Sequence, residues 1–455
     1  MKNRQLHHVL SFWKNHSKKS INRQILSTTA IVTGMTILVK IVSVSKEFVV
    51  AWSFGTGDAV DALVIALLLP MFITSVAAHS FRQAFIPVYI RVREQEGKQY
   101  AQGLLSSSLP YVVGILSLIT IIMVLFARLY LPEIATGFSP NKIELTYRLL
   151  LRTSPLIILN GIVTIWQAVL NAEERFAIAA LLPILIPALG IVLVLKTSFL
   201  GINALIIGML VGTLLQAIFL GVSLHQKGIS LVPKFNNLDS NLKEIFKLYG
   251  ASATAAFLMG STKIVDQSMA AMLAPGSVAA LSYGYKLTAL PLNLATIGLG
   301  TAVTPYFSKM TTSEDWQGIR NTLKSYLRLI FIVTIPLALT IFIFSVPIVE
   351  ILLQRGEFTA KDTNLVAQIQ SLYTLQLPFY VANIFIVRLI TSMRMNHVLI
   401  WISALNLFTN ITFNFLFTPL IGAAGIALST SLVYLICFLA SLTFIYQRIQ
   451  KAHQQ

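Results

Sequence analysis

Long apolar segments recur along the chain, and short polar segments separate them. The apolar positions predict membrane-spanning helices over 28–54, 59–80, 104–126, 146–170, 177–195, 201–223, 247–273, 278–300, 322–347, 365–390, 397–418 and 422–446. Each segment is close to the roughly 20 residues that a helix needs to cross the hydrocarbon of a bilayer. The pattern therefore predicts an all-α polytopic membrane protein with about 12 transmembrane helices.

Three landmarks of the first half of the chain recur in the second half. The pairs are Gly57 and Gly276, Pro87 and Pro305, and Pro155 and Pro378, each separated by about 220 residues. This repetition predicts two pseudo-symmetric six-helix lobes, an N-lobe over 28–223 and a C-lobe over 247–446. A polar cytoplasmic linker over 224–246 would join them. Paired lobes of this kind commonly enclose a central cavity and rock about it.

The composition supports a membrane protein and argues against a nucleic-acid partner. Hydrophobic residues make up 56% of the chain and charged residues only 11%, whereas a soluble domain has about 25% charged residues. The net charge of +17 comes mostly from Lys and Arg between the apolar segments. These residues are concentrated on the side of the N-terminus, which predicts cytoplasmic termini. The basic tail 1–27 would then lie on anionic lipid, and the tail 447–455 would share its side.

Charged residues within the first predicted helix form a pattern. Thr33, Thr36, Lys40, Ser43 and Glu47 recur at intervals of three or four and make one polar stripe. Such a stripe should face a cavity and not lipid, and Lys46 lies within reach of it. Lys286 stands at the matching place in the second lobe. Lysines from both lobes would suit an anionic substrate such as a phosphate or pyrophosphate; the alternative is that each lysine pairs with a structural carboxylate.

A second polar set lies toward the end of the chain. Asn406, Asn410 and Asn414 share a face of one predicted helix, and Thr430 follows on the next. With Asp266 they could offer oxygen ligands to Na⁺, although interhelical hydrogen bonding by the same side chains is the plainer alternative. Lys263 and Asp266 are three residues apart and could neutralise each other.

Cys437 is the only cysteine, and no enzyme motif occurs, so we expect no enzyme and no cofactor.

Four segments are similar to those of one known family. TILVKIVSVSKEFVVAWSFGTGDAVDALVIALLLP with SFRQAFIPVY, GSVAALSYGYKLTALPLNLATIGLGTAVTPYFSK, LLQRGEFTAKDT and FLFTPLIGAAGIALSTS occur in order. They resemble the first two helices, the eighth helix with its following loop, the loop before the tenth helix and the eleventh-to-twelfth turn of MurJ/MviN lipid II flippases. The resemblance implies a MATE-like (MOP) fold with a V-shaped cavity that opens alternately to each side.

The resemblance also assigns roles by position. Lys40, Lys46 and Lys286 stand where the family has cavity arginines, and Asp61 where it has an acid; with Glu47 and Arg388 they are the candidate substrate-binding residues. Asp266, Asn410, Asn414 and Thr430 match positions of the Na⁺ site proposed in some members. The chain departs from the family pattern in having lysines for arginines, which keeps charge but loses bidentate geometry. It also has Thr74 and 77–78 where an arginine and a Glu-Gly pair are usual.

These features predict a flippase in the plasma membrane of a bacterium. It would move a polyprenyl-pyrophosphate-linked saccharide, with lipid II as the leading cargo, by alternating access as a monomer. Na⁺, protons or the membrane potential would drive it. An exopolysaccharide or O-antigen repeat-unit flippase is the first alternative. A MATE-type cation-coupled drug exporter would need an acidic cavity, and a membrane-bound glycosyl- or phosphotransferase would need longer loops.

Overall fold

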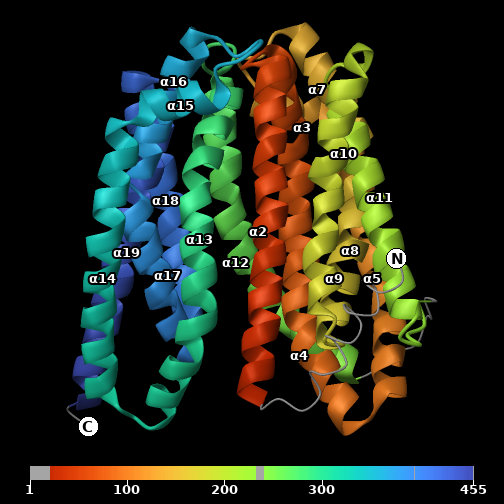
Figure 1. The fold of residues 1–455 in the computed structure, drawn as a ribbon, viewed down its shortest axis with the longest axis vertical. Helices are drawn as coiled ribbons and strands as arrows, with labels where there is room; N and C mark the ends of the chain where they lie inside the picture. Colours follow the sequence, from red (N-terminus) through yellow and green to blue (C-terminus); the bar gives the residue numbers. More distant parts are fainter. Residues whose placement is uncertain (1–20, 232–239, 394, 454–455) are drawn as a thin grey trace, which may run out of the picture.

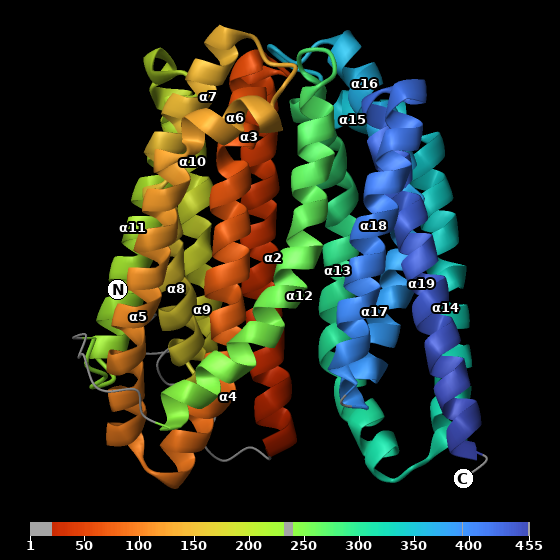
Figure 2. The same ribbon diagram turned by 180° about the vertical axis from the view of Figure 1, so that it is seen from behind.

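The computed structural model describes the backbone of residues 21–231, 240–393 and 395–453. Side chains are described within these ranges from residue 30 to residue 451, except at 251, 294–302, 304, 305 and 396. The described chain is helical and contains no β-strand. Its helices form two bundles that stand side by side (Figures 1 and 2). The predicted all-α, two-lobed architecture is confirmed.

The N-lobe contains the helices from α2 to α11. Their bounds are α2 Ile21–Phe54, α3 Asp58–Ile73, the π-helix η2 Thr74–His79, α4 Ser80–Gln95, α5 Lys98–Leu125, α6 Ala127–Ile134, α7 Pro140–Thr153, α8 Pro155–Ala172, α9 Phe176–Leu181, η3 Leu182–Ile184, α10 Leu185–Lys196, η4 Ser198–Leu200 and α11 Asn203–His225. Residues 1–20 of the predicted basic tail 1–27 lie outside the described residues, and 21–27 belong to α2.

The C-lobe contains the helices from α12 to α19. Their bounds are α12 Ser240–Ala271, α13 Ser277–Thr312, α14 Trp316–Ile343, α15 Ser345–Leu353, α16 Ala360–Thr374, α17 Leu377–Ser392, α18 Asn396–Ile421 and α19 Ala423–His453. Part of the predicted linker, 232–239, lies outside the described residues, and 240–246 already belong to α12. The last helix also runs through most of the predicted tail 447–455.

The two lobes repeat the same irregularities. In the N-lobe the long α5 is followed by the short α6, and α7 ends just before Pro155, which opens α8. In the C-lobe the long α14 is followed by the short α15, and α16 and α17 meet at a 42° bend beside Pro378. Proline fits the first turn of a helix because its missing N–H is not needed there. The proline pair of the sequence repeat therefore marks equivalent breaks.

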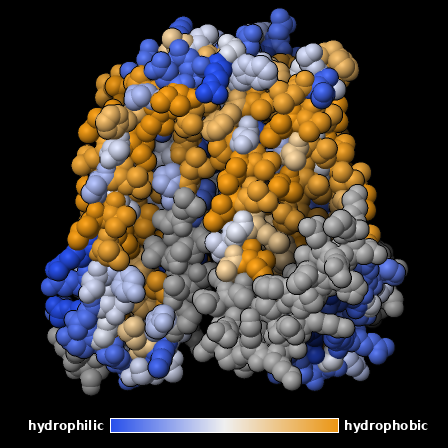
Figure 3. Space-filling model, in the orientation of Figure 1, coloured by the Kyte–Doolittle hydropathy of each residue, from blue (hydrophilic) through white to orange (hydrophobic). Residues whose placement is uncertain are grey.

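The apolar helices are long enough for a membrane. Eight helical stretches of the described chain meet the length and hydropathy of a membrane span, and the bent pair α16–α17 would make a ninth. The other predicted spans correspond to α2, α12 and α13, which carry more polar side chains. Figure 3 shows apolar residues across the middle of the molecule and polar residues toward both ends. The chain is a multi-pass membrane protein.

Two predicted helix ends were too early. The second predicted span stops at residue 80, but α3, η2 and α4 form one continuous path to Gln95. The eighth stops at residue 300, with a loop expected after it, but α13 continues to Thr312. AFIPVY and AVTPYF therefore lie in helices. A proline inside a helix removes one backbone donor and crowds the carbonyl group four residues earlier, but both helices continue through their prolines.

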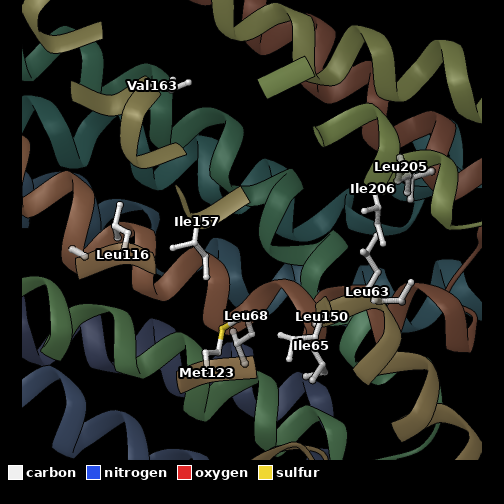
Figure 4. Close-up of a cluster of buried hydrophobic side chains, with 14 of the residues drawn as sticks. Leu63, Ile65, Leu68, Leu116, Met123, Leu150, Ile157, Val163, Leu205 and Ile206 are labelled. Carbon is white, nitrogen blue, oxygen red and sulfur yellow. The ribbon is translucent and has the colours of Figure 1, made fainter. Parts of the chain in front are cut away.

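The apolar core joins the lobes at the end where α2 passes into α3. The N-lobe core, part of which is shown in Figure 4, continues into C-lobe residues such as Tyr283, Val349 and Phe358. A separate core lies within the C-lobe and includes Phe307, Phe385 and Ile445. Close packing makes an interface rigid where it is continuous. The lobes are therefore fixed to each other at the end where α2 passes into α3.

Helix α12 belongs to both lobes. Its first half packs against α4 and η2 of the N-lobe, and its second half against α18 of the C-lobe (Figure 2). Phe246 and Phe257 make edge contacts with Phe81 and Phe72 of the N-lobe. Arg91 of α4 adds a bidentate ion pair to Glu244, with distances of 2.9 and 2.7 Å. The helix thus ties the two bundles together at their other end.

Candidate functional site

A buried carboxylate joins the lobes where α2 turns into α3. Asp61, 1% exposed, accepts hydrogen bonds from the backbone N–H groups of Gly276 at 2.8 Å and Ala279 at 2.7 Å, which open α13 of the other lobe. It also accepts from Nζ of Lys142 at 2.6 Å, and the same ammonium bonds Asp58 at 2.6 Å. A helix N-terminus favours a carboxylate because its first N–H groups are unpaired. We call Asp58, Asp61, Lys142 and the first turn of α13 the interlobe clasp.

Hydrogen bonds to backbone carbonyl groups extend the clasp on both sides. The Glu357 N–H donates to the Trp52 carbonyl at 3.0 Å, and the Tyr283 hydroxyl donates to the Gly55 carbonyl at 3.2 Å. Gly276 has φ +90°, and a Cβ there would lie 2.7 Å from the Thr56 carbonyl oxygen. Only glycine suits this position, since both its backbone conformation and its surroundings exclude a side chain. The lobes are closed to each other at this end.

A cavity of about 420 Å³ lies between the lobes. Its N-lobe wall is formed by Leu68, Met71, Phe72 and Ser75 of α3 and η2. The C-lobe wall contributes most of the polar groups, which are Thr262, Lys263, Asp266, Gln267, Ser282, Tyr285, Lys286, Tyr373, Thr430 and Tyr434. The volume lies within the range of about 300–1,000 Å³ that is typical of small-molecule sites. The cavity is thus apolar on one side and polar on the other.

Glu47 connects both lobes beside this cavity. Its Oε1 lies 2.7 Å from Nζ of Lys46 on the same helix, and its Oε2 lies 2.7 Å from Nζ of Lys286 on α13. The Lys286 ammonium also lies 5.6 Å from the centre of the Tyr283 ring. The carbon chain of Lys46 packs against Gly190 of α10. Its Cγ and Cδ atoms lie 3.6 Å from the position that a Cβ on Gly190 would occupy. The sequence-predicted set of Lys46, Glu47 and Lys286 therefore lies together, with two cations sharing one carboxylate.

Lys40 lies apart from this cluster. It is exposed and lines a second opening of about 340 Å³ between α2 and α13, whose other walls are Ile37, Ile41, Val44, Ser45, Phe48, Leu290 and Asn293. The polar stripe predicted along α2 therefore contributes side chains to two sites. Glu47 joins the ion-pair cluster and Lys40 lines the second opening, because the two residues are two helical turns apart. The opening is otherwise nearly apolar.

The predicted oxygen-rich set also lies together. Oδ1 of Asp266 accepts from the amide of Asn410 at 2.9 Å and from that of Asn414 at 2.7 Å. Thr430 lines the same cavity as Asp266. Asn414 Oδ1 is buried without a hydrogen-bond partner among the described residues. The described residues contain no group of three or more His, Cys, Asp or Glu that could hold a metal, so any ion here would depend on amide and hydroxyl oxygens.

Two expected cavity residues lie elsewhere. Asp61 belongs to the interlobe clasp and lines neither opening, because the α13 N-terminus and Lys142 enclose it. Arg388 lies partly buried on α17, and its Nε has no hydrogen-bond partner among the described residues. It lines neither of the two openings described above. Both placements correct the expectation that these side chains face the cavity.

The sequence did not indicate Lys263, Tyr285 or Lys142 as site residues. The spacing of Lys263 and Asp266 suggested that they could neutralise each other, but the described residues show no ion pair between them, and Asp266 accepts hydrogen bonds from two asparagines. The spacing of three residues on α12 permitted the pair without requiring it. Nothing in the sequence around Lys142 indicates its role. Asp58 and Asp61 lie together at the start of one helix, which could have predicted a cationic partner for them but not which residue supplies it.

Comparison with known proteins decides the family. A family model described as "Lipid II flippase MurJ" matches residues 50–455. The chain belongs to the lipid II flippase MurJ family. A probable MurJ of Synechocystis sp. is 25% identical over 423 residues, covering 90% of this chain and 79% of the relative. A probable MurJ of Vibrio cholerae is 26% identical, covering 91% and 81%.

Solved structures confirm the fold. A MurJ structure in an inward closed conformation has a TM-score of 0.79 at 24% identity and covers 93% of this chain and 90% of its own. An inward-facing MATE multidrug transporter of the MOP superfamily has a TM-score of 0.75 at 14% identity, with 94% and 99% coverage. The resemblance to MurJ proteins and the MATE-like fold are therefore confirmed. The family is one of membrane flippases named for lipid II, which is a lipid-linked substrate.

Proposed function

We propose that the protein moves lipid II across the plasma membrane of a bacterium by alternating access. The observation that carries this proposal is the sharing of Glu47 by Lys46 and Lys286, one lysine from each lobe. A pyrophosphate diester would replace the carboxylate as the partner of both ammonium groups. Lysine suits this exchange because its compact charge needs no fixed geometry. The cluster stays intact without cargo, since Glu47 pairs with both ammonium groups and offsets one of their two charges.

The lobes would exchange their closed ends during transport. With both termini in the cytoplasm, as the distribution of Lys and Arg favours, the interlobe clasp lies on the outer side and the described state is closed to the outside. A bound pyrophosphate contacts both lobes, so it can stabilise a state in which they approach at the inner end. Only binding that differs between the two states shifts their equilibrium. The lipid tail would remain in the bilayer at the apolar opening beside Lys40.

We infer that Na⁺ couples to this cycle at Asp266. Oxygen donors suit a hard cation of this kind, and the buried Asn414 Oδ1 is free of protein partners among the described residues. Asn410 and Thr430 would supply further oxygen atoms. The amide nitrogens that now face Asp266 would have to turn away, so binding requires a local rearrangement. Protons and the membrane potential are the competing drivers.

The rest of the proposal follows from the same features. The protein would act as a monomer, with lipid as its surroundings and no nucleic-acid partner, and it would catalyse no covalent reaction. A basic cavity makes export of cationic drugs unfavourable, because like charges repel within a poorly solvated site. The alternative cargo is an exopolysaccharide or O-antigen repeat unit, and the rescue experiment distinguishes it from lipid II.

The test is rescue of bacteria depleted of their own lipid II flippase. The wild-type chain should restore growth, whereas Lys46→Ala and Lys286→Ala should not, although both variants reach the membrane. Lys324→Ala, which alters an exposed lysine on α14, is the matched control and should rescue. Failure of the wild-type chain, together with loss of an exported polysaccharide in a deletion strain, would assign the other cargo. Rescue by both cavity variants would reject the proposed site.

A further inference from the structure

The C-lobe wall of the cavity has an exposed aromatic ring. The Tyr285 side chain is 44% exposed although it lies in a membrane-spanning lobe. The Tyr373 ring supports it edge-on, with ring centres 5.7 Å apart and an interplanar angle of 72°. Tyr373 is itself 3% exposed, so it holds the Tyr285 ring in place. A fixed aromatic face of this kind can receive the apolar C–H face of a sugar ring.

The same wall has a cation without a carboxylate partner. Lys263 lines the cavity and makes no ion pair among the described residues. Its neighbour Asp266 is engaged by Asn410 and Asn414, and Glu47 is engaged by Lys46 and Lys286. An ammonium at membrane depth is costly unless an anion or water satisfies it. Asp266 keeps its charge one helical turn away, so Lys263 adds to this wall an ammonium group that no carboxylate contacts directly among the described residues.

A hydrogen-bond acceptor completes the wall. Gln267 is 5% exposed and lines the cavity one turn after Lys263, and its Oε1 has no hydrogen-bond partner among the described residues. A buried carbonyl oxygen without a donor is unfavourable. A sugar hydroxyl would supply the donor. The opposite wall, with Met71 and Phe72, is apolar and can cover the other face of a ring.

We propose that Lys263, Gln267 and Tyr285 form a subsite for a sugar ring that bears a negatively charged substituent. The subsite rests on the proposed function and extends it, because it requires a cargo with an anionic group on its saccharide in addition to the pyrophosphate. Tyr285 receives the ring, Gln267 accepts from a hydroxyl, and Lys263 neutralises the substituent. The cluster of Lys46, Glu47 and Lys286 is left to the pyrophosphate.

The test is equilibrium binding of two soluble sugars to the full chain in detergent, measured by saturation-transfer NMR titration. Glucuronate and glucose are the probes, because they differ mainly in one carboxylate. Wild type should bind glucuronate about tenfold more tightly than glucose, since a charge-assisted hydrogen bond forms only with the former. Lys263→Gln should abolish this preference, and Lys263→Arg should retain it. Tyr285→Leu should weaken the binding of both sugars by a similar factor.

Controls separate the subsite from the fold and from the proposed function. Lys324→Gln on α14 should keep the preference, and thermal unfolding should show that each variant is folded. An unchanged preference in Lys263→Gln, or binding of neither sugar to wild type, would overturn the subsite. Titration with inorganic pyrophosphate addresses the other cluster. If wild type binds glucuronate but not pyrophosphate, the proposed function fails while the subsite stands.

Discussion

Glu47 on α2 and Lys286 on α13 form an ion pair of 2.7 Å that passes from one lobe to the other. The same carboxylate holds Lys46 at 2.7 Å. In the proposed function a diphosphate binds the same two ammonium groups, so Glu47 would be its intramolecular competitor. This competition would allow cargo to be released as well as bound, since the carboxylate would return when the cargo leaves.

Replacing Glu47 should therefore separate binding from turnover. Glu47→Gln removes the competing charge, so inorganic pyrophosphate should bind about tenfold more tightly, whereas transport of the lipid-linked cargo should fall because release is slower. Isothermal titration and a flipping assay measure the two effects. Glu350→Gln, at an exposed position on α15, should change neither. Weaker pyrophosphate binding in Glu47→Gln would show that the carboxylate organises the lysines and does not compete.

Asp61 should keep the clasp closed. Asp61→Ala removes the buried acceptor of two backbone N–H groups and of Lys142, at a cost of about 3 kcal/mol to the closed state. A single cysteine at Val278, which is 1% exposed, would report this opening in a Cys437→Ser background. A membrane-impermeant maleimide should label it faster when Asp61 is absent. Equal labelling rates with and without Asp61 would mean that other contacts hold the clasp.

Gly276 and Gly97 allow backbone strain to be separated from close contact. Both have positive φ, +90° and +100°, but a Cβ at Gly276 would lie 2.7 Å from the Thr56 carbonyl, whereas one at Gly97 meets nothing within 4 Å. Gly97→Ala should lower the free energy of unfolding by about 1–3 kcal/mol through strain alone, because φ +100° with ψ 169° suits essentially only glycine. Gly276→Ala should cost clearly more and should open the clasp. Equal losses of stability in the two variants would contradict the close contact.

Na⁺ dependence should disappear with Asp266. In wild type, replacing K⁺ by Na⁺ should raise both the thermal stability and the transport rate, because a bound ion stabilises the state that holds it. Asp266→Ala should remove both effects, and Asn414→Leu should reduce them. Asp58→Ala, which changes a clasp carboxylate, is the control and should keep the response to Na⁺. A Na⁺ response that survives Asp266→Ala would place the ion elsewhere.

The sequence predicted the helices and the first cluster because local patterns determine both. Lys46 and Glu47 are adjacent in the sequence, and Lys286 was linked to them by the resemblance to the family and by its place in the middle of a predicted span. Asp61 was misplaced because its environment depends on how the α13 N-terminus meets α3, which no local spacing encodes. Lys263 was misjudged for a similar reason. Lys263 lies on the same helix as Asp266, but Asp266 accepts hydrogen bonds from two asparagines on α18.

The most direct test of the central claim is flipping of fluorescent lipid II by the purified chain in proteoliposomes. Wild type should move lipid II between leaflets, Lys286→Ala should reduce the initial rate at least about tenfold, and Lys324→Ala should match wild type. Lipid II flipping at the wild-type rate by Lys286→Ala, or no flipping by wild type while another lipid-linked saccharide crosses, would contradict the account.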